Sequence, residues 1–357
     1  RLPVLVAYDG FFTSHQKRRI LVPTDRAAVA KFLGAAPSDV TALNPRQPTT
    51  FGPYMNDPDL INNKMQLSLA FEEARRVIPE VLAGLARITG RSIPVVDAYR
   101  MEDAEVALVL LNSAAETAKD AVDRLRAKGR KVGVVSPNVL RPFPGDEMRR
   151  LLGRVKAVLI GDRADSYGAA GGNLALEIRA ALQGLPGNRT LALSRIYGLG
   201  GRDFYTADAE AFFAEALEAV RRKKVLVPFA YYGAEKGDPT KAPPRGLPAL
   251  SAEEVTRGMA VVAPDADTGR LRVELKPLWE MTAVPSRVAP GHGACPGCGI
   301  FPVLHQIYRV LEGDLVVLFQ TGCAMVVTTG YPTTAHRVNY VHNLFQNGAA
   351  TLSGLVE

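Results

Sequence analysis

Val106-Ala107-Leu108-Val109-Leu110-Leu111 is an unbroken apolar run that leads directly into Asn112-Ser113-Ala114-Ala115. Because neighbouring residues of a strand point to opposite faces, a run that is apolar at every position predicts a strand buried on both faces. The residues that follow, 114–128, have the apolar spacing of a helix. A doubly buried strand followed by a helix is typical of an α/β fold, in which helices cover both faces of a parallel sheet.

The same alternation extends in both directions from this stretch. Short runs rich in Val, Ile and Leu predict strands, and the segments between them predict helices. The predicted strands are 93–96, 106–111, 132–135, 155–160 and 190–193, and the predicted helices are 114–128, 145–153, 172–183 and 206–223. Thr206 is the expected N-cap of the last helix, whose carboxyl end carries basic residues that favour the helix dipole. We therefore expect one complete α/β domain with a parallel sheet.

The regions that flank this domain have simpler patterns. Residues 3–8 predict a strand that ends at Asp9 and Gly10, where Asp9 and Ser14 are expected to cap a turn. Frequent prolines make 41–60 an extended connection, and residues 63–90 predict a helix with a kink or break at Pro79. Residues 224–289 are interpreted as a linker that contains a hairpin-like segment around 259–273.

Three loops follow predicted strands, the position at which α/β proteins often bind ligands. The glycine-rich residues 166–172 precede a helix and resemble a phosphate cradle, but they lack the dinucleotide-binding fingerprint. A plain loop-to-helix transition is the favoured interpretation. The loops 141–144 and 198–203 are expected to make contacts rather than to catalyse a reaction.

All three cysteines lie in the last part of the chain, as Cys295, Cys298 and Cys323. The first two form a Cys-x-x-Cys loop bracketed by glycines, which suits a soft metal or an iron–sulfur cluster. A zinc site would need a fourth ligand from His292, His305, His336 or His342, none of which has the usual spacing to Cys323. A thioredoxin-like site would leave Cys323 unexplained. Three ligands of a [4Fe-4S] cluster fit the count better, although zinc remains open.

The overall composition excludes few classes of protein. The chain has 357 residues and a net charge of +7, enough length for two or three domains. No apolar run approaches the ~20 residues of a membrane span, and no signal peptide is evident. The sequence opens and closes inside patterned segments, so we expect a fragment or processed piece. Two cysteines in one Cys-x-x-Cys indicate a reducing cytoplasm, and the basic charge permits an acidic partner without requiring one.

The cysteine region resembles the start of the β subunit of pyruvate (2-oxoacid):ferredoxin oxidoreductases. Three motifs carry this resemblance: Gly291-His292-x-x-Cys295-x-Gly297-Cys298-Gly299, Thr321-Gly322-Cys323 with Val326-Val327-Thr328-Thr329-x-Tyr331-Pro332, and His342-x-x-Phe345-x-Asn347-x-Ala349-Ala350. The upstream part is similar to the α subunit of the same family, through Asp9-Gly10-Phe11-x-x-Ser14-His15, Tyr54, Arg141-Pro142-Phe143-Pro144 and Gly198-Leu199-Gly200-Gly201-Arg202-Asp203. The end of an α subunit would thus be joined to the start of a β subunit.

The resemblance implies thiamine-diphosphate-enzyme (transketolase-like) domains, each with a parallel sheet flanked by helices. Residues 1–60 would be the last part of the pyrimidine-binding domain, 61–92 a connecting helix and 93–223 a transketolase C-terminal-like domain. Residues 224–289 would be the linker and 290–357 the first part of the pyrophosphate-binding domain.

The implied reaction is oxidative decarboxylation of a 2-oxoacid, most often pyruvate, to acyl-CoA and CO₂. The implied cofactors are thiamine diphosphate, Mg²⁺ and a [4Fe-4S] cluster, with Cys295, Cys298 and Cys323 as metal ligands and Gly322, Cys323, His342 and Asn347 as cofactor-binding residues. The implied partners are ferredoxin, coenzyme A, further subunits and a second copy of the chain, with no nucleic acid and no membrane. Residues that would bind Mg²⁺, and the catalytic residues, lie outside this sequence, so the fragment alone should be inactive.

Two departures from the family pattern stand near the cysteines. Met325 stands where the family often has an acidic residue, and His336 stands where an aromatic residue is common. The alternatives are a relative that acts on a branched-chain 2-oxoacid or oxalate, and a non-catalytic zinc-binding α/β interaction protein.

Overall fold

The computed structural model describes residues 2–10, 12–17, 19–34, 54–234, 251, 258–290, 292–330 and 334–356. The chain divides into two compact units, Arg1–Glu235 and Lys236–Glu357. Among the described residues, no helix is both long and apolar enough to cross a membrane.

The first unit is built on a six-stranded sheet with the order β1-β3-β2-β4-β5-β6. Its strands are β1 (Val96–Tyr99), β2 (Val106–Val109), β3 (Val132–Pro137), β4 (Ala157–Asp162), β5 (Leu191–Ile196) and β6 (Phe229–Tyr231). Neighbouring strands are parallel except β1, which runs antiparallel to β3. The predicted α/β fold with a sheet flanked by helices is therefore confirmed.

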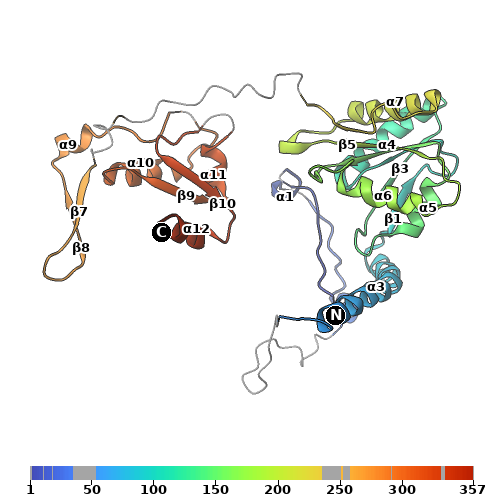
Figure 1. Ribbon diagram of the computed structural model, residues 1–357, viewed down its shortest axis with the longest axis horizontal. Coiled ribbons are helices and arrows are strands. Elements are labelled where there is room, and N and C mark those ends of the chain that lie inside the picture. The colour runs from blue at the N-terminus through green and yellow to red at the C-terminus, as the bar shows by residue number, and fades with distance from the viewer. Residues whose placement is uncertain are drawn as a thin grey trace, which may run out of the picture. The chain divides into compact units, whose positions relative to one another are not determined.

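Helices cover both faces of this sheet, and the strand residues alternate between them. Helices α4 (Asn112–Ala127) and α7 (Thr206–Arg222) lie on one face, and α5 (Gly145–Leu152) and α6 (Asn173–Gln183) on the other (Figure 1). In β2, Val106 and Leu108 belong to the α4/α7 core, whereas Ala107 and Val109 belong to the α5/α6 core. This explains why the run was apolar at every position.

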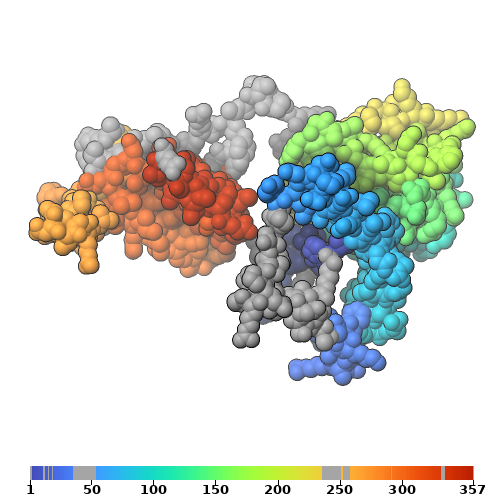
Figure 2. Space-filling model, turned by 60° about the horizontal axis from the view of Figure 1, so that its bottom comes forward, coloured from blue at the N-terminus to red at the C-terminus, as the bar shows by residue number. Residues whose placement is uncertain are grey.

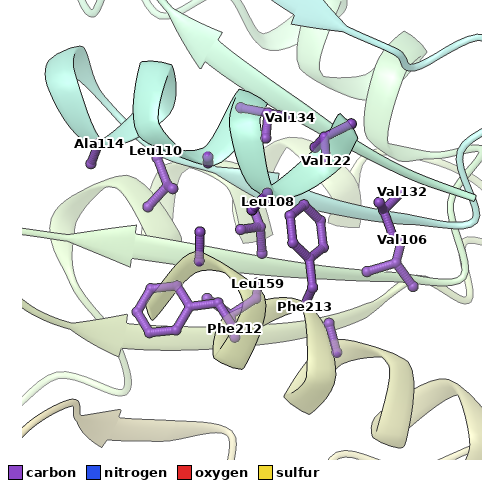
Figure 3. Close-up of a cluster of buried hydrophobic side chains, with 14 of the residues drawn as sticks. Val106, Leu108, Leu110, Ala114, Val122, Val132, Val134, Leu159, Phe212 and Phe213 are labelled. Carbon is purple, nitrogen blue, oxygen red and sulfur yellow. The ribbon is translucent and has the colours of Figure 1, made fainter. Parts of the chain in front are cut away.

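Aromatic residues of α7 fill the larger core. Phe212 and Phe213 are completely buried and point from α7 toward the strands that carry Leu108 and Leu159 (Figure 3). The ring of Phe212 also meets the rings of Tyr197, Phe204 and Tyr232, at centroid distances of 5.9, 5.4 and 4.8 Å. Such pairs add to the free energy gained by burial alone.

Several details of the first unit differ from the sequence-based predictions. The strand predicted at 93–96 begins only at Val96, because Pro94 cannot donate a ladder hydrogen bond. β6 falls within the predicted linker. The N-cap of α7 is Tyr205 rather than Thr206, and the Tyr205 amide donates to the Asp208 carboxylate at 2.8 Å.

The segment before the sheet contains α1 (Phe12–His15), α2 (Arg26–Leu33) and the long α3 (Asp59–Thr89). α3 continues through Pro79 without the predicted break. The position is exposed, so water can hydrate the carbonyl that Pro79 leaves without a donor. α2 packs on α3, where Phe32 lies against Gly84. α3 forms a ridge on the surface shown in Figure 2. The strand predicted at 3–8 is wrong: these residues are extended and exposed and pair with no strand among the described residues.

The second unit has smaller elements. β9 (Val316–Gln320) and β10 (Asn339–Asn343) form a parallel pair, accompanied by α10 (Ile300–Val310), α11 (Cys323–Thr328) and α12 (Gly348–Val356). The predicted hairpin is confirmed as β7 (Ala260–Pro264) and β8 (Leu271–Leu275), which α9 (Leu278–Thr282) follows (Figure 1).

Few residues of the second unit are fully buried. The residues of β9 are exposed or half-buried. On α10, Val303 and Ile307 are about half exposed. Phe301, Leu304 and Tyr308 are buried instead, because the two aromatic side chains offer more apolar area and are spaced along one helix face.

Candidate functional site

The Cys295–Cys298 segment forms a tight turn at the start of α10. The Cys298 amide donates to the Cys295 carbonyl oxygen at 3.1 Å, and Gly297 has φ +78°, a conformation that other residues rarely adopt. His292 fixes the approach to this turn, since its ring stacks on Phe301 at 3.7 Å and its Nδ1 accepts from the Ala294 amide at 3.3 Å. Cys295 is exposed and Cys298 half-buried, and neither is in a disulfide. The sequence and packing thus present two free thiols from one turn.

Cys323 is presented by a different element. It is the first residue of α11, directly after β9 and Gly322, and its thiol is free and exposed. The Val326 amide donates to the Gly322 carbonyl oxygen at 3.0 Å, which closes the first turn of the helix.

The arrangement of the three thiols decides whether they form a metal centre in this structure. Across the described residues, no three His, Cys, Asp or Glu side chains form a group that could hold a metal ion. The donor chemistry, three accessible thiols with two in one turn, suits a soft metal or an iron–sulfur cluster. The turn fits two ligands, whereas Cys323 does not join them in one group in this structure. The assignment of Cys295, Cys298 and Cys323 as ligands stays a prediction.

His342 lies one residue before the end of β10, and Gly322 follows shortly after the end of β9. Because the two strands are parallel, both residues lie at the same edge of the pair. The His342 Nε2 is 2.9 Å from the Thr321 hydroxyl, which also donates to the Asn343 carbonyl oxygen at 3.1 Å. Because that hydroxyl hydrogen is used, Thr321 accepts from His342 Nε2–H. Two of the predicted cofactor-binding positions, Gly322 and His342, are thus linked through Thr321.

Asn347 adds an unsatisfied polar atom to this region. Its side-chain oxygen is buried and has no hydrogen-bond partner among the described residues, while its backbone carbonyl accepts from the Thr351 amide at 3.0 Å at the start of α12. A buried carbonyl oxygen without a donor is costly and rare in proteins, and an unfilled ligand position is one explanation. The next residue, Gly348, packs against Gln320 so closely that a Cβ would lie 2.5 Å from its side chain. The assignment of Asn347 as a cofactor-binding residue stays a prediction.

The glycine-rich loop before α6 has no free phosphate cradle. The carboxylate of Asp162, at the end of β4, accepts from the amides of Leu174 and Ala175 at 2.8 and 3.2 Å. Burial raises the pKa of this carboxyl group, and the two amides partly oppose that rise. Gly172 is required for this contact, because a Cβ there would lie 2.4 Å from the Asp162 carboxylate. The interpretation of 166–172 as a loop-to-helix transition is confirmed.

Asp9 has a role that the sequence did not predict. Its carboxylate accepts from the Ser113 amide at 3.0 Å and from the Ser113 hydroxyl, and it lies 3.6 Å from the Arg163 guanidinium. α4 has no side-chain cap of its own, so Asp9 caps it from a distant segment. Burial raises the pKa of Asp9, but the Ser113 hydrogen bonds and the Arg163 charge outweigh it, and the net pKa is lowered.

The two loops predicted to make contacts do so within the first unit. Arg141 pairs with Glu177 of α6 at 2.6 Å, and Arg202 donates to the Gly233 carbonyl oxygen at 2.6 Å. The sequence carried no signal for Arg163, Ser113 or Asp162 beyond their places at strand ends, because their partners are far along the chain.

Comparisons with known proteins find similarity in the first unit. Residues 104–209 match the model of the pyruvate:ferredoxin oxidoreductase core domain II. The PorA subunit of pyruvate synthase from Thermotoga maritima is 36% identical over 217 residues, which cover 61% of this chain and 55% of that protein. The chain spans about half the length of the curated relatives it matches. Over these residues the chain is therefore similar to core domain II of pyruvate:ferredoxin oxidoreductases and to pyruvate synthase PorA subunits.

Two further similarities were found. The alpha subunit of an NADH-dependent phenylglyoxylate dehydrogenase from Aromatoleum evansii is 33% identical over 210 residues, 57% of this chain and 50% of that protein. A 2-oxoglutarate:ferredoxin oxidoreductase structure from Magnetococcus marinus has a TM-score of 0.28 and 21% identity, and the match covers 35% of this chain and 20% of that one.

Proposed function

We propose that the chain is part of a thiamine-dependent 2-oxoacid:ferredoxin oxidoreductase that acts on pyruvate. The observation that carries this proposal is a core domain II match at 104–209 in a chain that also bears the Cys295–Cys298 turn and Cys323. The relationship to pyruvate synthase subunits supports the substrate and further subunits. A 2-oxoacid with an aromatic side chain is the second candidate substrate, because a phenylglyoxylate dehydrogenase subunit is similar at 33% identity.

The residues of the second unit would hold the cofactors. Bound thiamine diphosphate and Mg²⁺ would supply the carbanion chemistry of decarboxylation, with single electrons leaving through a [4Fe-4S] cluster to ferredoxin and the acyl group passing to coenzyme A. Gly322 and Cys323 would border the cofactor at the carboxyl edge of β9. The Asn347 side-chain oxygen would accept a hydrogen bond there, and Thr321 would keep His342 in one orientation.

The three thiols would act as thiolates toward the cluster. Cys295 and Cys298 would bind from the turn and Cys323 from the start of α11, with a fourth ligand from outside this sequence. Residues 1–60 would contribute to the pyrimidine-binding domain, 61–92 would connect, and 93–223 would form the transketolase C-terminal-like domain. Residues 224–289 would be a linker, and 290–357 would begin the pyrophosphate-binding domain. We place the enzyme in the cytoplasm, with no membrane or nucleic-acid partner.

The test uses the complete enzyme that contains this chain, purified without oxygen. Iron, sulfide and zinc are measured in the wild type and in Cys298→Ala, with Ser353→Ala on exposed α12 as the matched control. We expect iron and sulfide in equal amounts, a deficit only in Cys298→Ala, and pyruvate- and coenzyme A-dependent reduction of a viologen dye. Zinc without sulfide would contradict the proposal. Faster reduction with phenylglyoxylate than with pyruvate would favour the second substrate.

A further inference from the structure

His336 is a buried side chain whose ring is bonded on both nitrogens. Its exposure is 5%, and the surrounding unit is much more open. Nδ1 is 3.0 Å from the Tyr308 hydroxyl, and Nε2 is 2.9 Å from the Thr328 hydroxyl. Neither partner is close to His336 in the chain, so these bonds depend on the tertiary structure.

The hydrogen positions of this network follow from Thr328. Its hydroxyl donates to the Ala324 carbonyl oxygen at 2.6 Å, so it can only accept from the histidine. Nε2 therefore carries the hydrogen, Nδ1 is the acceptor, and the Tyr308 hydroxyl donates to it. Burial lowers the pKa of His336, which agrees with this neutral form.

The two partners belong to the helices that present the cysteines. Tyr308 is on α10, which begins directly after Cys298, and Thr328 is on α11, which begins with Cys323. One imidazole thus joins the two cysteine-bearing helices. Cys323 is the first residue of α11 and Thr328 is the last, so the bond to Thr328 holds one end of a short helix whose other end carries Cys323.

The ring is also fixed by aromatic contacts. It stacks on Tyr340 of β10 at a centroid distance of 4.6 Å and lies 5.3 Å from Phe319 of β9. The backbone on either side is bonded to the 287–289 segment: the Ala289 amide donates to the Ala335 carbonyl oxygen at 2.8 Å, and the Arg337 amide donates to the Arg287 carbonyl oxygen at 2.9 Å. A ring held by stacking and by two hydrogen bonds has little freedom to move.

We propose that His336 is a positioning residue, which fixes α10 and α11 relative to each other and so sets the separation of the Cys298 and Cys323 thiols. The purpose assigned to that separation, a shared cluster, rests on the proposed function. The geometry itself can be measured without any cluster.

The test is pulsed electron–electron spin resonance on the full chain, with spin labels on Cys298 and Cys323 in a Cys295→Ser background. His336→Phe keeps an aromatic ring but loses both hydrogen bonds, Tyr308→Phe removes only the Nδ1 bond, and Thr328→Val removes only the Nε2 bond. His305→Phe is the matched control, because His305 lies on α10 and its ring bonds Ser286 instead of α11. Circular dichroism confirms that each variant is folded.

We expect the label-to-label distance distribution to broaden about twofold in His336→Phe, because buried hydrogen-bond networks rigidify their surroundings. Tyr308→Phe and Thr328→Val should broaden it less, and His305→Phe should match the parent. An unchanged distribution in folded His336→Phe overturns the proposal. If His336→Phe does not fold, Tyr308→Phe and Thr328→Val provide the test: unchanged distance distributions in both variants overturn the proposal.

A parallel measurement of iron and sulfide after anaerobic reconstitution of the complete enzyme, which also supplies the fourth ligand, separates the two proposals. An enzyme that binds no iron, but whose distribution broadens in His336→Phe, would contradict the cluster and support the positioning role. If the wild type and His336→Phe have the same distance distribution and both take up iron normally, the positioning role is contradicted and the cluster is supported.

Discussion

The sheet domain of the first unit and the cysteine-bearing second unit differ in how completely their strands are buried. In β2, β3 and β4 every residue is buried, and helices cover both faces. In β9 and β10 no residue is fully buried, and Val316 is 53% exposed. The first unit therefore gains its stability from its own core, whereas the second exposes the elements that present its thiols. The second unit has a small buried cluster around Phe301, Leu304 and Tyr308, together with polar contacts such as those of His336 and Thr321.

The largest test of this difference is truncation of one phenylalanine in each unit. Phe212→Ala, in the completely buried core, should lose about 3–5 kcal/mol of unfolding free energy because it leaves a cavity. Phe345→Ala, at a side chain that is 64% exposed, should change it by less than about 0.5 kcal/mol. Urea unfolding followed by circular dichroism measures the first, and fluorescence of Trp279, the single tryptophan, follows the second unit. Equal losses would contradict the comparison.

A smaller effect is expected where the sheet domain is closely packed around α6. Gly172→Ala forces a methyl group against Asp162 and should cost about 1–3 kcal/mol. Gly184→Ala is the control at the other end of the helix, where φ is −71° and the nearest atom lies at 3.4 Å. It should be neutral or slightly stabilising. Thermal unfolding measures both, and an unchanged midpoint in Gly172→Ala would show that the Asp162 cap is not tightly packed.

Asp9 tests whether the segment before the sheet is fixed to the first unit. Asp9→Asn should destabilise the chain by up to about 1 kcal/mol at pH 7, because the neutral amide loses the charge attraction to Arg163 and to the N-terminus of α4. Because the folded pKa of Asp9 is lowered, its contribution is present above the unfolded pKa of about 4 and is lost as the pH falls through the folded value. The difference from the wild type should thus shrink in acid. Unfolding curves from pH 7 to pH 3 measure it.

Asp267→Asn serves as the control for that series, since this exposed residue lies in the β7–β8 turn. It should stay within about 0.5 kcal/mol of the wild type throughout. A difference for Asp9→Asn that grows in acid would reverse the assigned direction.

The smallest effect is expected on the hairpin of the second unit. Leu271→Ala, at a side chain that is 73% exposed, should change the unfolding free energy by less than about 0.5 kcal/mol. Leu159→Ala, the same change at a completely buried position of β4, should cost about 2–5 kcal/mol. A large loss for Leu271→Ala in urea unfolding followed by Trp279 fluorescence would show that the hairpin packs against other residues of the chain in solution.

The sequence by itself determined the elements whose burial is complete. Residues 106–111 are apolar at every position because helices cover both faces of the strand, so pattern and structure agree. The Cys295–Cys298 turn was also readable, since Gly297 supplies the left-handed conformation within the motif itself. The extended residues 3–8 were misread because a strand needs a neighbour, which a local pattern does not reveal.

Only the tertiary structure decided the long-range polar contacts. Asp9 caps a helix that begins at Asn112, Asp162 fills the N-terminus of α6, and His336 joins Tyr308 to Thr328. Hydrogen bonds are short and directional, so they depend on the packed positions of whole elements. Hydrophobic burial is not directional and follows the local period of the chain, which is why it can be read from the sequence.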